Sequence, residues 1–317
     1  MNKTGYFTHR DCRKHDMGRG HPECPARLDA IDDRLLLTGV LDALDQRSPP
    51  LAERGDLLRA HSEAHMARLE ALDARLAQQM DAGGPDHAAI DPDTTLCSHT
   101  LQAALRAAGA AVAATDAVVA GELRNAFCAV RPPGHHAEHD RAMGFCFLNN
   151  VAVAARRALD LHGLRRVAIV DFDVHHGNGT EDIFAGDERV LMVSFFQHPF
   201  YPGSGTEHPA ANMLNLPVPA YTKGNEVREL VEMFWLPRLE AFRPEMVFIS
   251  AGFDAHREDE LGQLRLTEQD FAWITSRIRE VAERHAGGRI VSCLEGGYHL
   301  DALACSVEAH LRVLADL

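Results

Sequence analysis

The sequence predicts an α/β fold in which helices flank a parallel sheet. Short apolar runs such as 167–170 and 246–249 are typical of strands that are buried on both faces of a sheet. Longer segments with helical periodicity, such as 267–285, separate these runs. No repeat, low-complexity tract or linker divides the 317 residues, so we predict a single domain over 1–317.

Composition narrows the class of protein. A hydrophobic content of 46% supports a large core, and the formal net charge of −14 argues against nucleic-acid binding and against a basic membrane-surface helix. The charge is compatible with a cationic substrate, although acidic cytosolic proteins are common. The seven cysteines are odd in number, contain no C-x-x-C pair and predict free thiols. With no signal-peptide pattern and no apolar run of membrane-spanning length, we expect a cytoplasmic protein.

The N-terminal region predicts a short strand at 4–8 and a helix from about Ala26 to Leu37. Before this helix, His21-Pro-Glu-Cys-Pro fixes an extended chain. The polar residues His21, Glu23 and Arg27 either line a site or cap the helix.

Residues 40–120 read as mostly helical. His61 and His65 have i, i+4 spacing at the start of an amphipathic segment, and we interpret them as ordinary helix-face histidines because no further ligand motif follows. The alanine-rich helix at 98–119 is expected to pack closely against the sheet.

The rest of the chain alternates between strands and helices. The predicted strands are 125–130, 167–170, 190–196, 246–250 and 290–294, and the predicted helices are 151–161, 227–242 and 267–285.

Each of these five strands is followed by, or ends in, polar residues. They are His135 and His136, then Asp171, Asp173 and His175, then Ser194, Asp254 and Tyr298. Because ligands bind outside the carboxyl ends of the strands in open parallel sheets, these groups are expected to meet there.

Asp171, Asp173 and His175 alternate just past the end of one strand, so all three converge on one face if the strand geometry persists that far. Buried carboxylates without partners cost several kcal/mol each. Carboxylate oxygen with imidazole nitrogen suits zinc or a similar divalent metal. The alternative is a hydrogen-bonded cluster that only supports the strand end.

Several motifs, in this order, resemble those of the zinc-dependent histone deacetylase family, which includes bacterial deacetylase-like amidohydrolases, acetoin-utilisation proteins and acetylpolyamine amidohydrolases. They are Arg131-Pro-Pro-Gly-His-His-Ala137, Gly144-Phe-Cys146, Asp171-x-Asp-x-His-His-Gly177, Ala251-Gly-Phe-Asp254 and Glu295-Gly-Gly-Tyr298. The resemblance implies an arginase/deacetylase-like single domain with a mainly parallel eight-stranded sheet.

The resemblance also implies one zinc ion, held by Asp173, His175 and Asp254, with Asp171 supporting the ligands. His136 would act as general base and then general acid, and His135, tied to Asp171, as its electrostatic partner. Tyr298 would donate its hydroxyl to the oxyanion.

Two further sets follow from the resemblance. A structural potassium ion would be held by Asp171, Asp173, His175, Ser194 and Phe195. Substrate would contact Asp93 (with Asp91 as the nearby alternative), Gly144, Phe145, Tyr201 and Leu261.

Two positions depart from the most common family pattern. Asn178 stands where one branch has an aspartate, so the chain is nearer the class II branch. Tyr201 stands where phenylalanine is frequent, and its phenol adds a polar tip to the expected wall of the pocket.

The activity implied is hydrolysis of an N-acetylated lysine-like amine, on a peptide or a small molecule, with release of acetate. An acetylpolyamine amidohydrolase is the alternative, although eukaryotic polyamine specialists carry glutamate where this chain has Leu261. A catalytically silent acyl-binding module is a more remote one. An arginase-type two-metal hydrolase would need aspartates that the motifs do not supply.

Overall fold

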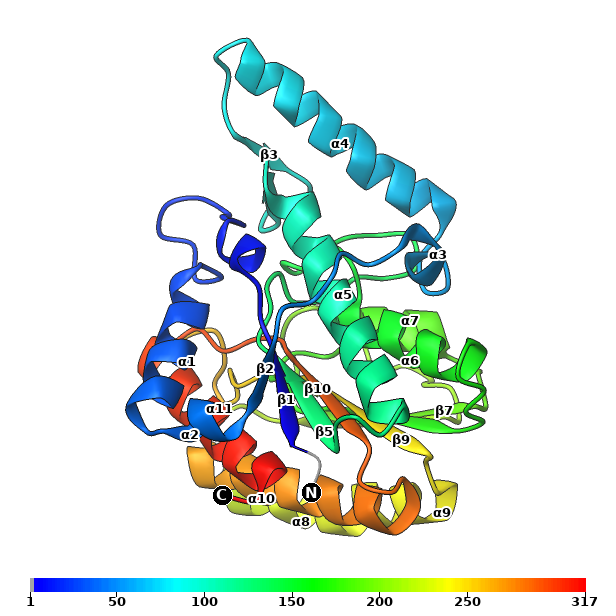
Figure 1. Ribbon diagram of the computed structural model, residues 1–317. Helices are drawn as coiled ribbons and strands as arrows, with labels where there is room; N and C mark the ends of the chain where they lie inside the picture. Colours follow the sequence, from blue (N-terminus) through cyan, green and yellow to red (C-terminus); the bar gives the residue numbers. More distant parts are fainter. Residues whose placement is uncertain (1–2) are drawn as a thin grey trace.

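The computed structural model describes residues 3–317, and within them eight strands form one sheet in the order β2-β1-β5-β10-β9-β6-β7-β8. Every pairing in this sheet is parallel. The α/β fold with a mainly parallel eight-stranded sheet is therefore confirmed (Figure 1). The strands are β1 Thr4–Phe7, β2 Asp45–Arg47, β5 Asn125–Cys128, β6 Val167–Asp171, β7 Val190–Gln197, β8 Met213–Val218, β9 Met246–Ala251 and β10 Ile290–Leu294.

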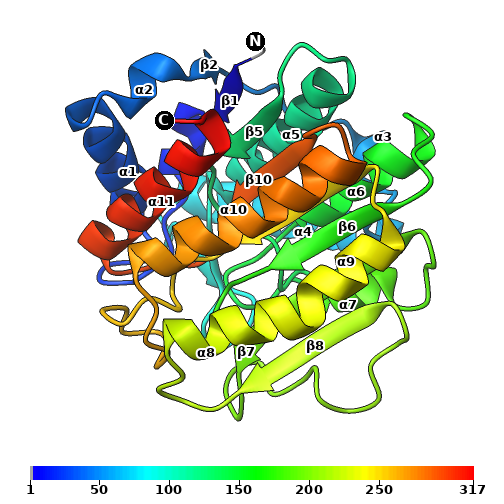
Figure 2. The same ribbon diagram turned by 90° about the horizontal axis from the view of Figure 1, so that it is seen from below.

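Helices cover both faces of the sheet (Figures 1 and 2). One layer contains α1 Ala26–Leu37, α2 Val40–Ala43, α8 Gly224–Leu230, α9 Leu236–Phe242, α10 Glu268–His285 and α11 Leu300–Ala315. The other contains α3 Arg54–Leu57, α5 Thr100–Val119, α6 Asn150–Asp160 and α7 Asn178–Phe184. Because both faces are covered, the central strands β6, β9 and β10 are buried at every position, which is why they consist of continuous apolar runs.

The alanine-rich helix α5 is confirmed and packs closely. It lies against α6 and β5, and a Cβ atom on Gly109 would lie 2.1 Å from the carbonyl oxygen of Pro50. Small side chains on this helix therefore allow the chain at 50–52 to cross it in contact with its backbone.

Residues 40–120 contain more extended structure than the sequence predicted. Edge strand β2 lies there, together with a small antiparallel hairpin, β3 His87–Ala89 and β4 Thr95–Cys97, beside the projecting helix α4 Glu63–Asp81 (Figure 1). Helix α4 begins after its N-cap, Ser62, so His61 precedes the helix rather than sharing a face with His65.

The other differences have local causes. Strand β8 was not predicted because it is only partly buried and contains Pro217, which is tolerated at a sheet edge. The predicted helix 227–242 is divided by a π-helical turn, Val231–Trp235, which ends two residues before Pro237; this proline lacks the N–H for a regular helical bond. Helix α11 was not predicted either, although its apolar residues recur at helical spacing.

All seven cysteines are free, as expected, and within residues 3–317 no helix is both long enough and apolar enough to cross a membrane.

Candidate active site

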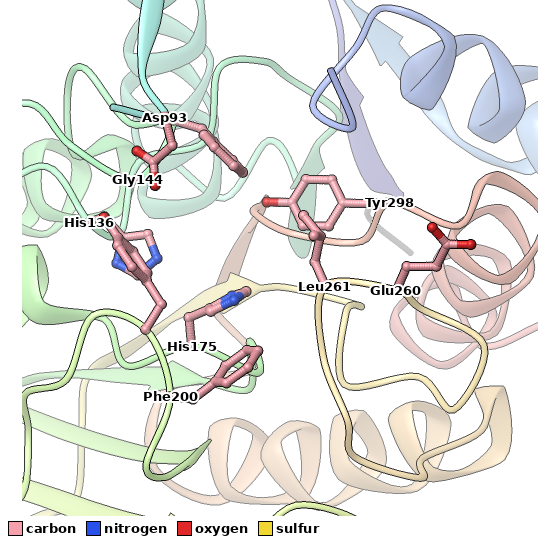
Figure 3. Close-up of a pocket in the computed structure, with 10 residues that line it drawn as sticks. Asp93, His136, Gly144, His175, Phe200, Glu260, Leu261 and Tyr298 are labelled. Atoms are coloured by element: carbon pink, nitrogen blue, oxygen red, sulfur yellow. The ribbon is translucent and has the colours of Figure 1, made fainter. Parts of the chain in front are cut away.

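The loops after β5, β6, β9 and β10 meet at the carboxyl edge of the sheet, where these four strands are neighbours. They surround a cavity of about 250 Å³ (Figure 3). Its lining consists of Asp93, His136, Gly144, Phe145, His175, Phe200, Tyr201, Glu260, Leu261 and Tyr298. All five predicted substrate-binding residues therefore line one cavity.

The three predicted zinc-binding side chains converge at His175, which lines this cavity. His175 Nδ1 lies 3.0 Å from Asp173 Oδ1 and 3.2 Å from Asp254 Oδ2. One ligand atom from each of the three residues lies within 4.8 Å of the others. The arrangement matches the predicted set, although Asp254 follows a different strand from the other two.

The surroundings of this trio fit a bound cation. Asp254 Oδ2 is buried and accepts no hydrogen bond, and burial followed by the charge of Asp173 raises the pKa of Asp254 to about 7. A Cβ atom on Gly296 would lie 2.0 Å from Asp254 Oδ2, and one on Gly252 would lie 2.0 Å from Asp173 Oδ2. Glycine at both positions leaves the carboxylate oxygens accessible, and a divalent cation bound by Asp254 Oδ2 and His175 Nδ1 would satisfy the carboxylate oxygen that accepts no hydrogen bond.

Asp171 lies outside this trio. Its Oδ1 accepts the backbone N–H of Asp173 at 3.1 Å, and its Oδ2 lies 2.9 Å from His135 Nδ1. Asp171 therefore orients a neighbouring ligand and a neighbouring histidine, the supporting position that the resemblance implied.

The adjacent histidines His135 and His136 have opposite electrostatic environments, although their ring centroids are only 4.0 Å apart. Burial opposes a charge on His135, yet Asp173 and Asp171 outweigh it and hold the pKa of His135 well above its ordinary value. Burial lowers the pKa of His136 well below its ordinary value, and the rings of His135 and His175 lower it further. One histidine is thus suited to remain charged, and the other to accept a proton.

Tyr298 stands across the cavity from His136, with its hydroxyl directed into the space between them (Figure 3). No residue in the described chain hydrogen-bonds this hydroxyl. The backbone N–H of Tyr298 donates to Asp259 at 2.6 Å, and the guanidinium of Arg27 lies 4.9 Å from the centre of its ring. The ring is therefore held in place while its hydroxyl remains available to a ligand.

Arg27 belongs to a buried ion network that the sequence did not resolve. Arg27 Nε donates to the carbonyl of Gly297 at 2.6 Å, and Glu23 accepts from both Arg27 and Arg131. All three charged side chains are fully buried. Glu23 and Arg27 thus stabilise the Gly297–Tyr298 turn. The His21 ring packs on Phe145, with 4.7 Å between the ring centroids.

Aromatic rings form the walls of the cavity. Phe200 stacks on His175 at 5.4 Å, Tyr201 meets His136 edge-on at 5.3 Å, and Phe145 meets Tyr298 edge-on at 6.0 Å. A Cβ atom on Gly144 would lie 2.5 Å from the His136 ring, so only glycine fits beside that histidine.

The rim separates the two candidate aspartates. Asp93 lines the cavity, whereas Asp91 accepts the backbone N–H groups of Asp93 and Thr94 and so stabilises the turn. Burial, and then Asp91, raise the pKa of Asp93 above its ordinary value.

Ser194 pairs in register with Asp171 on the neighbouring strand, and its hydroxyl lies 3.3 Å from Asn215 Oδ1. This places Ser194 beside the predicted potassium residues. His61 and His65 lie elsewhere: both are buried, and they bond the backbone N–H of Asn149 and the carbonyl of Phe147. They connect the start of helix α4 to the loop that contains Phe147 and Asn149, and they do not belong to the candidate metal-binding trio.

Sequence reasoning did not assign Phe200 or Glu260 to the site. The sequence feature that could have indicated Phe200 is the aromatic loop 198–205, and the one for Glu260 is the acidic stretch before Leu261. Neither signal indicates which side chain faces the cavity.

The fold and the site together define an α/β protein with a carboxylate–imidazole centre beneath an aromatic-lined cavity, the arrangement expected of a metal-dependent hydrolase. Residues 21–314 match the histone deacetylase domain, and the chain belongs to that family.

Named relatives agree with this assignment. The chain is 40% identical over 286 residues to a histone deacetylase-like amidohydrolase of Pseudomonas aeruginosa, covering 88% of this chain and 73% of that protein. It is 36% identical over 306 residues to a probable deacetylase of Archaeoglobus fulgidus, covering 94% and 82%. The crystal structure of the HDA15 HD domain matches with a TM-score of 0.91 at 32% identity, covering 100% of this chain and 90% of that one. Family membership supports a hydrolase of the deacetylase class that acts on acetylated substrates.

Proposed function

We propose that the protein is a zinc-dependent amidohydrolase that removes the acetyl group from an N-acetylated lysine-like amine and releases acetate. One observation carries the proposal. One cavity is lined by His175 of the Asp173, His175 and Asp254 trio, and His136 and the Tyr298 hydroxyl face each other across it.

Asp173, His175 and Asp254 would hold the zinc, which when bound polarises a carbonyl and lowers the pKa of water. His136 accepts the proton of the attacking water and then delivers a proton to the leaving amine. His135, charged beside Asp171, stabilises developing negative charge, and Tyr298 donates its hydroxyl to the oxyanion of the substrate.

The walls suit an extended alkyl chain. Phe145 and Tyr201 flank it, Gly144 leaves room beside His136, and Asp93 at the rim accepts N–H groups of the substrate backbone. For the structural potassium we propose Asp171, Ser194 and the backbone carbonyls of Asp173, His175 and Phe195.

An acetylated polyamine is the second candidate substrate, because Glu260 lines the cavity beside Leu261 and has no ion-pair partner in the part of the chain that the structure describes. Its carboxylate, however, points away from the cavity centre (Figure 3). This orientation favours the neutral stem of acetyl-lysine over a cationic chain within the cavity. A cytoplasmic location stays a prediction.

The test is a comparison of hydrolysis rates for an acetyl-lysine peptide, longer acyl-lysine peptides and acetylated polyamines, with zinc-loaded and chelator-treated protein. We expect the acetyl-lysine peptide to react fastest, and zinc to restore the activity that the chelator removes. Faster hydrolysis of polyamines would favour the second candidate. Binding without turnover of any substrate would favour the acyl-binding module.

A further inference from the structure

A chain of polar contacts leads from His136 out to the protein surface. His136 Nδ1 lies 2.7 Å from Asn178 Oδ1, and Asn178 Nδ2 donates to Glu138 Oε1 at 2.7 Å. Arg141 then donates to the same carboxylate, from Nε to Oε2 at 3.0 Å and from Nη2 to Oε1 at 2.9 Å. The histidine and the asparagine are buried, Glu138 is partly buried and Arg141 is exposed.

The direction of each hydrogen bond in this chain is set mainly from its outer end, because the other acceptor beside Asn178 Nδ2 is the weakly accepting sulfur of Met143, 3.4 Å away. A guanidinium only donates and a carboxylate only accepts, so the Asn178 side chain must turn its NH₂ group towards Glu138. The amide oxygen then faces His136, and the imidazole must donate to it from Nδ1. The single proton of neutral His136 is therefore fixed on Nδ1, which leaves the Nε2 lone pair free.

Asparagine cannot impose this arrangement by itself. Its amide is nearly symmetric in shape, and a 180° turn would present NH₂ to the histidine. His136 would then accept at Nδ1 and carry its proton on Nε2, where it could not act as a base. With Glu138 in place, the turned amide would set two acceptor oxygens 2.7 Å apart, which is repulsive.

We propose that Glu138 is a positioning residue that acts through Asn178 to hold His136 in the tautomer with a free Nε2 lone pair. The inference rests on the proposed function, in which His136 is the general base. Arg141 serves the same end by holding the Glu138 carboxylate.

A double-mutant cycle on the zinc-loaded enzyme tests the proposal, with Glu138→Ala, Asn178→Asp and the double variant. In the parent chain, which keeps Asn178, Glu138→Ala should lower kcat by about tenfold or more, since general-base catalysis contributes about 10²–10⁴. KM should stay within about threefold, because the walls that hold the substrate chain do not change and the altered His136 Nε2 acts on the attacking water. In the Asn178→Asp background the same substitution should leave kcat unchanged or raise it, since an aspartate accepts from Nδ1 by itself and is relieved of a like charge.

Equal losses in both backgrounds would assign Glu138 a purely structural role, and no loss in the parent chain would also overturn the proposal. Glu207→Ala is the matched control. Glu207 lines the same surface cavity as Glu138 and Asn178 but has no contact with the Asn178 amide. The kcat of Glu207→Ala should therefore stay within about twofold of the parent value.

A spectroscopic measurement separates this inference from the proposed function. In protein labelled with ¹⁵N-histidine, the His136 signals, assigned with a His136→Gln variant, should show the proton on Nδ1, and Glu138→Ala should introduce the Nε2–H form. Protein that hydrolyses no acetylated amine but shows this shift would refute the function and retain the orientation. An unchanged tautomer in Glu138→Ala would refute the orientation whatever the activity.

Discussion

Replacing Tyr298 by phenylalanine removes one oxygen atom from the cavity and leaves the rest of the side chain in place. The ring keeps its position 4.9 Å from the Arg27 guanidinium and 6.0 Å from the Phe145 ring. Since no described residue hydrogen-bonds the hydroxyl, its loss leaves no buried group without a partner. We therefore expect the free energy of unfolding to change by less than about 0.5 kcal/mol.

The catalytic effect should be far larger. If the hydroxyl donates to the oxyanion, its removal should cost about 10²–10³ in kcat, which corresponds to about 2.7–4 kcal/mol of transition-state stabilisation. KM should change little, because this interaction strengthens only as charge develops on the substrate oxygen. Zinc content should not change, since Tyr298 is not one of the three candidate ligands.

The measurements are kcat and KM on an acetyl-lysine peptide, zinc by elemental analysis, and thermal unfolding. Tyr201→Phe is the matched control: it deletes the same atom from another wall of the same cavity, where the ring packs edge-on against His136. We expect Tyr201→Phe to stay within about threefold of the parent kcat. If Tyr298→Phe and Tyr201→Phe reduced kcat equally, or if Tyr298→Phe retained full kcat, the oxyanion role would be wrong.

Two further predictions address the metal centre and the core. Gly296→Ala places a Cβ atom 2.0 Å from Asp254 Oδ2 and 2.6 Å from Asp173 Oδ2, so zinc content should fall while the fold persists. The control is Gly55→Ala, because a Cβ atom there meets nothing within 4 Å. Full zinc content in Gly296→Ala would contradict the ligand assignment. Burial lowers the pKa of His310 to about 3, so between this value and about pH 6.5 the unfolded chain binds a proton that the folded protein does not. The contribution of neutral His310 to the free energy of unfolding is therefore fully present above about pH 6.5 and is lost as the pH falls towards 3. Between pH 7 and 5 this loss amounts to about 2 kcal/mol. We expect His310→Gln to reduce by that amount the difference between the free energies of unfolding measured with urea at the two pH values. An undiminished difference would mean that His310 is not neutral in the folded protein.

Local sequence patterns were sufficient for the elements whose environment is uniform. Strands β6, β9 and β10 are buried on both faces, so their apolar runs are unbroken and easily recognised. The edge strands β2 and β8 were missed because edge positions are half exposed and impose no such pattern.

By itself, the sequence determined which residue types follow the strands, including Asp173 and His175 just beyond β6, which ends at Asp171. Tertiary structure decided what joins them. It brought in Asp254 from β9, placed Arg27 beneath a tyrosine near the other end of the chain, and set Glu138 against the amide of Asn178. The physical reason is that periodicity records whether a side chain is buried, whereas the order of strands in the sheet and the paths of the loops decide which buried polar groups become neighbours.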